Sequence, residues 1–307
     1  MHKVIITGGA GFIGSHLAEE LVKQCDEVTV LDDLSSGKLE NIEGIQKNIR
    51  FVNGSINDSS LLETLLKDID IVFHLAAIPG VFRSVEDPYS SHDTNLTGTL
   101  NLLLAARNNK VKKVIYASSS SAYGDTPTLP KKEHMTPHPL SPYAVSKLAA
   151  EYYCLVFNTV YGANNVCLRY FNVYGPRQEP DSQYAAVIPL FINNIIAGSP
   201  PVIFGDGSQT RDFTYVKDVV KANILAAQND ACGVFNISRG EKITINKLAG
   251  LIGEIMNSKV EPIYKEARPG DVIHSMADIT KAKEFGFKPE FDLKTGLMET
   301  IKWFHDQ

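Results

Sequence analysis

The stretch Ile5-Ile6-Thr7-Gly8-Gly9-Ala10-Gly11-Phe12-Ile13-Gly14 decides the fold of this chain. The segment from Lys3 to Ile6 is apolar and β-branched after its first residue, which is typical of a strand buried on both faces. Beyond the glycines, apolar residues recur at helical spacing at Phe12, Ile13, Leu17, Leu21 and Val22. The glycines therefore stand where a strand turns into a helix.

The glycine spacing predicts a dinucleotide-binding turn. Gly8, Gly11 and Gly14 give G-x-x-G-x-x-G, and Gly9 with the last two gives G-x-G-x-x-G. Glycine permits the tight turn, the approach of the backbone to a pyrophosphate and close packing of helix on strand. The helix N-terminus offers unpaired N–H groups to the phosphates. Cofactor contacts are predicted at Gly8, Gly11, Phe12, Ile13 and Gly14.

A second buried strand, Glu27 to Leu31, ends at Asp32. A carboxylate about 20 residues past the glycines is placed to hold the adenosine ribose hydroxyls of a dinucleotide. The simpler interpretation, that Asp32 only ends the strand, is disfavoured by its register with the glycines. Asp33 follows where an arginine would suit a 2′-phosphate, so NAD is predicted over NADP. The next loop, with Ser36 and Gly37, is expected near the adenosine end.

The composition is that of an ordinary globular protein. The chain has 307 residues, 44% of them hydrophobic and 21% charged, and a net charge of −5. This charge gives no reason to expect nucleic acid or an anionic membrane as a partner. The cluster of Lys110, Lys112 and Lys113 is interpreted as a solvated helix end. Neither a signal peptide nor a membrane span of about 20 apolar residues is expected.

Cysteine and histidine spacing predicts neither a disulfide framework nor a metal site. The four cysteines are scattered without a C-x-x-C pair. Of the eight histidines only His134 and His138 stand at H-x-x-x-H spacing, with Pro137 between them and outside the predicted helices. A reducing cytoplasm is therefore the expected compartment.

Strands and helices alternate regularly through the first part of the chain. Further strands are predicted at 50–52, 70–77, 114–117 and 166–170, and further helices at 61–66, 95–108 and 143–157. This alternation predicts an α/β, Rossmann-type, doubly wound parallel sheet. His74 is interpreted as a core residue of its strand. Ligands lie outside the carboxyl ends of such strands, so the glycine turn, Asp32, residues 75–77, 118–121 and 170–172 are expected to form one site.

The pattern changes from about Tyr174, where shorter elements separated by Gly- and Pro-rich loops begin. We predict an NAD-binding domain at residues 1–174, to which 213–238 return, with Val234–Ile237 as a strand of the main sheet. A smaller α/β substrate lobe is predicted at 175–212 and 239–307. Its last helix carries the only tryptophan, Trp303, as an expected core residue.

Tyr143 and Lys147 form a Tyr-x-x-x-Lys pair on one face of a predicted helix, with Pro142 in its first turn. A phenol has an ordinary pKa of about 10, and a nearby cation is expected to lower it by about 1–3 units. Tyr143 could then take a proton from a substrate hydroxyl while hydride leaves the same carbon. Alone, such a pair is more often a surface pair, but here it follows a dinucleotide fingerprint and a serine cluster.

Together these motifs make the sequence resemble the extended short-chain dehydrogenase/reductase family, and within it the UDP-hexose 4-epimerases. The resemblance covers nearly the whole chain. It is carried by Thr7–Gly14, Asp32, Ser118–Gly124, Tyr143–Lys147, Leu168–Tyr174, Arg211–Phe213 and Arg268–Asp271. Leu140–Lys147 and Tyr184–Pro189 are most similar to the subgroup that acts on N-acetylated UDP-hexosamines.

The resemblance implies catalytic roles for three residues. Ser119 would bond the substrate O4, Tyr143 would be the base, and Lys147 would be its partner and would bond the nicotinamide ribose. The resemblance also implies Ser120 and Ser121 as substrate contacts that share the task of Ser119. Further implied cofactor contacts are Leu75, Ala76, Ala77, Asn95, Tyr170, Ser55 and Ile56. Ser55 replaces an aspartate that the family often has on the adenine amino group, which bears on the adenine contact and not on the chemistry.

The resemblance also implies a UDP site. Asn172 would meet the diphosphate, Phe204 would lie on the uracil, and Arg211 and Arg268 would pair with the phosphates. Asp271 would hold the uridine ribose. Val187 and Val202 are further implied substrate contacts. Ser275 matches a position that is a large tyrosine in epimerases restricted to non-acetylated sugars, so we expect room for UDP-GlcNAc and UDP-GalNAc beside UDP-Glc and UDP-Gal.

The expected activity is thus NAD-dependent C4 epimerisation of a UDP-hexose through a 4-keto sugar. The resemblance also implies a homodimer through the helices near 95–108 and 143–157. A 4,6-dehydratase is disfavoured because Ser120 and Ser121 stand where it needs an acidic pair. A UDP-uronic acid 4-epimerase or decarboxylase of the same family stays open. A non-catalytic NAD-binding sensor is a distant alternative, because it could dispense with Tyr143, Lys147 and the arginines, and all of them are present.

Overall fold

The centre of the molecule is a parallel sheet of seven strands in the order β11-β6-β5-β4-β1-β2-β3. The computed structural model describes residues 2–24, 27–180, 186–267 and 272–307. Every neighbouring pair in the sheet is parallel. Its strands are β1 (Lys3–Thr7), β2 (Glu27–Asp32), β3 (Ile49–Asn53), β4 (Ile71–His74), β5 (Lys113–Ser119), β6 (Asn165–Tyr170) and β11 (Gly233–Ile237). The doubly wound sheet is confirmed, including the return of 234–237 to its edge.

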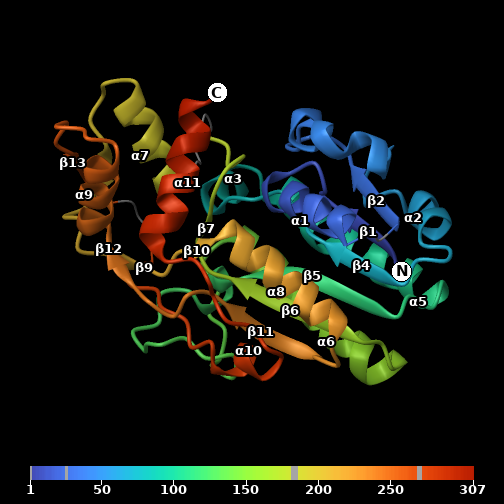
Figure 1. Cartoon of the computed structure of the whole chain (residues 1–307). Helices are drawn as coiled ribbons and strands as arrows, with labels where there is room; N and C mark the ends of the chain where they lie inside the picture. The colour runs from blue at the N-terminus through green and yellow to red at the C-terminus, as the bar shows by residue number, and fades with distance from the viewer. Residues whose placement is uncertain (1, 25–26, 181–185, 268–271) are drawn as a thin grey trace.

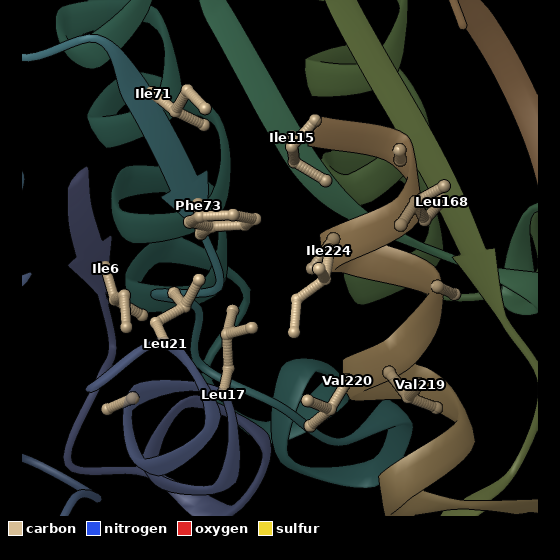
Figure 2. Packing of buried hydrophobic residues seen from close by; sticks show 14 of the residues in the cluster. Ile6, Leu17, Leu21, Ile71, Phe73, Ile115, Leu168, Val219, Val220 and Ile224 are labelled. Carbon is tan, nitrogen blue, oxygen red and sulfur yellow. The ribbon is translucent and has the colours of Figure 1, made fainter. Parts of the chain in front are cut away.

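Helices cover both faces of this sheet (Figure 1). The helices α1 (Phe12–Lys23) and α8 (Val216–Gln228) pack on one face, where Leu17, Leu21 and Val220 point toward the strands (Figure 2). Each fully buried Leu or Val side chain contributes about 1.5–3 kcal/mol by leaving water. A ten-residue 3₁₀ segment, Leu39–Asn48, links β2 to β3 and adds Ile42 to this core.

The opposite face is covered by α2 (Ser59–Leu65), α5 (Thr99–Asn108) and α6 (Pro142–Tyr161). The helix predicted at 95–108 begins as a π-helical segment, Asp93–Gly98, and continues as α5. Leu102 and Leu103 of α5 are fully buried, whereas Leu96, Leu100 and Leu104 pack at the margin of this core.

The start of α6 is fixed by its first residues. The Ser141 hydroxyl accepts a hydrogen bond from the Ala144 N–H at 3.1 Å, and Pro142 occupies the first turn. Gly162, with φ of 66°, ends the helix in the left-handed conformation. These signals place Tyr143 and Lys147 in the first two turns, at the end of the helix that faces the carboxyl edge of the sheet.

The later part of the chain adds smaller elements around a separate apolar core (Figure 1). Around this core pack α7 (Val187–Ile196), α9 (Ile245–Ile255) and α11 (Leu293–His305), whereas α10 (Thr280–Glu284) packs against β11 and adds Ala282 to the core of the main sheet. The strand pairs of this later part are β8 (Val202–Phe204) with β13 (Ile263–Lys265), β9 (Thr210–Arg211) with β12 (Ile243–Thr244), and β7 (Val173–Tyr174) with β10 (Thr214–Tyr215). Trp303 packs against the separate core only partly buried, so it is less enclosed than predicted. The division into two domains stays a prediction.

Short elements complete the chain near the carboxyl edge of the sheet. They are α3 (Val81–Glu86), α4 (Pro88–His92) and the 3₁₀ turn Ser120–Tyr123. Within the described ranges, no helix combines the length and the apolar character needed to cross a membrane.

The interpretation of the lysine cluster at 110–113 as a solvated helix end is wrong for Lys113. Lys112 is exposed and pairs with Asp70 at 2.7 Å. Lys113 is the first residue of β5 and is 5% exposed. Its ammonium donates to the carbonyls of Ala226, at 3.0 Å, and Asn229. Burial lowers the pKa of Lys113. The strand carries this side chain inward, under the end of α8.

Candidate active site

Two cavities open at the carboxyl edge of the main sheet. The first, here called the dinucleotide cavity, lies along the ends of the central strands. Predicted residues that line it are Gly8, Gly11, Phe12, Ile13, Gly14, Asp32, Ser36, Ile56, Leu75, Ala76, Ala77, Tyr143, Lys147 and Tyr170. Residues far apart in the sequence thus meet in one cavity, as the parallel topology requires.

The glycine turn fits the approach of a dinucleotide. A Cβ on Gly14 would lie 2.1 Å from the Gly8 carbonyl oxygen, and one on Gly8 would lie 2.7 Å from the Ala76 nitrogen. Gly8 also has φ of 69°, which side chains rarely adopt. The N-terminus of α1 opens directly on the cavity, which Gly11, Phe12 and Ile13 line. A pyrophosphate placed there would meet backbone N–H groups and the positive end of the helix.

Asp32 is held rigidly in the wall of this cavity. Its carboxylate accepts hydrogen bonds from the N–H groups of Ala10 and Leu34, both at 2.9 Å. Burial raises the pKa of Asp32, and the two N–H bonds oppose this. Gly37 is packed behind it, since a Cβ there would lie 2.7 Å from the Asp32 Oδ1. Such a fixed, half-desolvated carboxylate suits the hydroxyls of a ribose, so the chain's residues fit NAD.

Three predicted cofactor residues do not line the dinucleotide cavity. Gly37 makes room for Asp32, as described above. The Ser55 hydroxyl accepts from the Asn57 N–H at 3.3 Å and so orders its own loop. Asn95 is 1% exposed, and its amide bonds both the N–H and the carbonyl of Ile78, at 2.7 and 3.1 Å. Gly37 and Asn95 support the cavity from behind.

Tyr143 and Lys147 both line the cavity, and Ser119, which does not line it, lies beside Tyr143. The Ser119 side chain hydrogen-bonds the Tyr143 hydroxyl. The Lys147 ammonium lies 4.5 Å from the centre of the Tyr116 ring, an arrangement that stabilises its charge. Burial lowers the pKa of Lys147 to about 8.

The expected lowering of the Tyr143 pKa is wrong for the protein by itself. Burial raises the pKa of Tyr143, and the hydrogen bond from Ser119 only partly offsets this. Desolvation penalises the phenolate because the charged form loses water. A lowered pKa would therefore require an additional positive charge in the cavity.

The serine cluster is arranged around Ser119. The N–H and hydroxyl of Ser121 both reach the Ser119 Oγ, at 3.1 and 2.8 Å. Ser120 lies half-buried in the same 3₁₀ turn. Ser118 points the other way, and its hydroxyl donates to Glu151 at 2.6 Å.

A buried ion pair beneath this cluster was missed from the sequence. Arg169 donates to both carboxylate oxygens of Glu151, at 2.9 and 2.6 Å. The two side chains are 3% and 0% exposed. The available signal was a charged residue, Arg169, inside an otherwise apolar strand, together with a glutamate eight positions beyond Tyr143. The pair ties β6 to α6 and orients Ser118, the neighbour of Ser119.

The second cavity lies between the main sheet and the smaller elements. Predicted residues that line it are Asn172, Val187, Val202, Phe204 and Arg211. Most of its remaining wall is apolar, including Phe191 and Phe213. Asn172 has φ of 34° and its amide donates to the Asp212 carbonyl at 2.9 Å. Phe82, from α3, also lines this cavity, and no spacing in the sequence indicates it.

Among the described residues, the predicted substrate residue Ser275 does not line this cavity. Arg268 and Asp271 fall outside the described residues. Ser275 is 8% exposed and its N–H donates to the Thr210 carbonyl at 3.1 Å. Ser275 is therefore buried beside β9, the strand that also contains Arg211, and is not in the wall of the cavity.

Comparison with known proteins assigns the family. Residues 4–238 match the model of the "NAD dependent epimerase/dehydratase family", and the chain belongs to this family. A "Putative UDP-glucose 4-epimerase" of Methanocaldococcus jannaschii is 41% identical over 98% of this chain and 97% of its own length. A "UDP-N-acetyl-alpha-D-glucosaminuronate decarboxylase" of Bacillus cytotoxicus is 39% identical over 99% of this chain and 98% of its own length.

A solved structure is similar over its whole length. It is UDP-N-acetylglucosamine 4-epimerase from Methanobrevibacter ruminantium M1 in complex with UDP-N-acetylmuramic acid. Its identity to this chain is 46% and the TM-score is 0.97, with 100% of this chain and 99% of that chain covered. The predicted family, fold and NAD cofactor are thereby confirmed.

The glycine geometry gives a direct prediction. Gly14→Ala should weaken NAD binding at least ten-fold, because the new methyl group would overlap the Gly8 carbonyl and force the turn open. Titration of the cofactor-free protein with NAD measures this. Gly250→Ala in α9 is the matched control, since a Cβ there meets nothing within 4 Å. Equal NAD affinity of the Gly14 variant and the control would contradict the assignment of the turn.

Proposed function

We propose that this chain is an isomerase that catalyses NAD-dependent C4 epimerisation of a UDP-hexose through a 4-keto sugar. The observation that carries the proposal is that Tyr143 and Lys147 line the dinucleotide cavity together and that Ser119 is the hydrogen-bond partner of Tyr143. A base and its hydrogen-bond partner stand there beside the space that fits NAD. The relatives named as UDP-sugar 4-epimerases support the same reaction.

The residues divide the chemistry as follows. Bound NAD supplies a reversible hydride acceptor. Tyr143 takes the proton of the C4 hydroxyl as the C4 hydrogen leaves as hydride, while Ser119 holds O4. Lys147 would hold the nicotinamide ribose, and the positive charge that the bound oxidised cofactor adds to the cavity would favour the Tyr143 phenolate. The 4-keto sugar would rotate while its UDP group stays bound, the hydride would return from the reduced cofactor to the opposite face of C4, and Tyr143 would return the proton to O4.

The second cavity is the proposed UDP site. Phe204 stacks on the uracil, Arg211 pairs with the phosphates and Asn172 meets the diphosphate, with Val187 and Val202 as apolar neighbours. Support comes from their common lining of one largely apolar cavity with a guanidinium at its edge. Arg268 and Asp271 remain proposed contacts on the family resemblance alone.

A second candidate in the same family is the conversion of a UDP-uronic acid, by C4 epimerisation or decarboxylation. It is favoured by the decarboxylase relative at 39% identity. Both reactions begin with the same oxidation at C4, so the base and cofactor do not separate them. The product does, because decarboxylation removes a carbon and releases carbon dioxide.

Removal of the base tests the proposal. Tyr143→Phe should fold and bind NAD as before but lose about 10²–10⁴-fold in turnover, the usual contribution of a positioned acid–base group. Proton NMR of products from UDP-GlcNAc and UDP-glucose measures this. The C4 epimer from the natural chain supports the proposal. Turnover only of a UDP-uronic acid would replace it with the second candidate, and an active Phe variant would remove Tyr143 from its role.

Acceptance of N-acetylated sugars is proposed on Ser275. Since Ser275 is buried beside β9, a tyrosine there would have to push toward the neighbouring cavity. Ser275→Tyr should therefore lower turnover of UDP-GlcNAc at least ten-fold more than that of UDP-glucose. Parallel assays of both substrates decide this. The idea fails if both rates change by the same factor or if only UDP-glucose is a substrate of the natural chain.

We also propose a homodimer built on α6 and the adjoining α5. Val145, Tyr152, Val156 and Val160 recur at helical spacing on the outer face of α6 and are 52%, 47%, 49% and 63% exposed. Such a stripe is typical of a covered face. Sedimentation equilibrium should give twice the chain mass, and Val156→Asp should shift it to the monomer. A monomeric natural chain at micromolar concentration would exclude the dimer.

The proposed compartment is a reducing cytoplasm. Cys154 on α6 and Cys167 on β6 are both fully buried, lie in contact and are free thiols. Two neighbouring thiols that stay reduced are usual where glutathione and thioredoxin act.

A further inference from the structure

His74, at the end of β4, has no part in the proposed reaction, yet both of its ring nitrogens are engaged. Its Nδ1 lies 2.7 Å from the Thr7 hydroxyl oxygen and its Nε2 lies 2.8 Å from the Thr99 hydroxyl oxygen. His74 and Thr7 are 0% exposed and Thr99 is 1% exposed. Such a wholly buried network of polar side chains is costly in free energy unless every donor and acceptor in it is hydrogen-bonded.

The partners fix the direction of every hydrogen bond in this buried network around His74. The Thr99 hydroxyl lies 2.7 Å from the Asn95 carbonyl, which only accepts, so Thr99 donates there. Thr99 must then accept from the Nε2–H of His74. A neutral imidazole has one N–H, so its Nδ1 accepts from the Thr7 hydroxyl. Thr7 in turn accepts from the Ala76 N–H at 3.3 Å.

The imidazole is neutral because of its surroundings. Burial is the main cause that lowers the pKa of His74 to about 3, and the Lys147 ammonium acts in the same direction. The Tyr116 ring, 5.6 Å from the imidazole centre, closes the same side. In the opposite tautomer the Nδ1–H would point at Thr7, so the Thr7 hydroxyl hydrogen would lose its acceptor. Thr99 would then have to donate to Nε2, and the Asn95 carbonyl would lose its donor.

The two ends of this hydrogen-bond network both bind the same wall of the dinucleotide cavity. At one end Thr7 holds Ala76, next to the point where Gly8 approaches the Ala76 backbone. At the other end the Asn95 side chain holds both backbone groups of Ile78. Leu75, Ala76, Ala77, Ile78 and Pro79 all line the cavity.

The same network reaches the catalytic helix. The Asn95 amide donates to the Ser146 hydroxyl at 3.2 Å, and Ser146 donates to the Tyr143 carbonyl at 2.9 Å. The glycine turn, the cavity wall and the first turn of α6 are therefore joined through one set of directed hydrogen bonds.

We propose that His74 is a positioning residue of the NAD site. As a neutral, Nε2-protonated bridge it holds residues 75–79 against the glycine turn and against α6, without touching the cofactor itself. NAD binds tightly only when this wall is in place, because the cofactor must be enclosed from both sides.

Variants that keep one arm of the bridge test the proposal. His74→Asn places an amide oxygen near the Nδ1 position and retains an acceptor for Thr7, whereas His74→Leu removes both arms. We expect the Leu variant to bind NAD at least ten-fold more weakly, about the effect of one lost hydrogen bond. The Asn variant should recover most of this affinity. Titration of the cofactor-free proteins with NAD measures both without any sugar, so the result does not depend on the substrate proposed above.

A packing control separates positioning from general destabilisation. Phe73→Leu alters the preceding residue of β4, which is 1% exposed and faces the opposite core. It should lower the melting temperature while leaving NAD affinity within about two-fold. If Phe73→Leu and His74→Leu weaken NAD binding equally, or if the Asn variant is no better than the Leu variant, His74 is only a packing residue.

The natural protein gives an independent test that needs no variant. Nitrogen-15 NMR of the labelled imidazole should show the Nε2–H tautomer of His74 at pH 7, unchanged down to about pH 5. An Nδ1–H tautomer or a charged ring at pH 7 would overturn the proposed bridge.

Discussion

The structure depends on the contact between two backbones at the carboxyl edge of the sheet. The turn after β1 touches the start of α1 and the loop after β4 so closely that a methyl group on Gly8 or Gly14 would overlap main-chain atoms. Only glycine fits at these two positions, because the backbone contact leaves no room for a side chain. The strands on either side must then end at the same level, which brings their following loops around one cavity.

Polar groups buried behind that edge keep it in shape. Thr7, His74 and Asn95 form one directed network, while Ser118, Glu151 and Arg169 form another beneath the serine cluster. Buried polar groups rarely add much net stability, but each one left unpaired is costly. They therefore select a single arrangement of the loops, which is what hydride transfer needs.

Much of this site could be predicted from the sequence because glycine spacing, buried strands and strand-end residues follow from local rules. The cavity lining by Asp32, Ala76 and Tyr143 was predicted in this way. Long-range partners could not be, since Glu151 and Arg169 are far apart in the sequence and show no common spacing. Lys113 was misjudged because a charged residue at a strand start can turn either way. The raised pKa of Tyr143 follows from burial in three dimensions, which a Tyr-x-x-x-Lys motif does not report.

The helix α6 has two working faces. Its inner face presents Tyr143 and Lys147 to the dinucleotide cavity, and its outer face carries the exposed apolar stripe. A helix of 20 residues is a stiff rod about 30 Å long, held here by Glu151 at its middle. A partner seated on the outer face would thus brace Tyr143 from behind. For a paired chain, specific activity would then fall on dilution even with NAD in excess, since separated subunits would leave that rod supported on one side only.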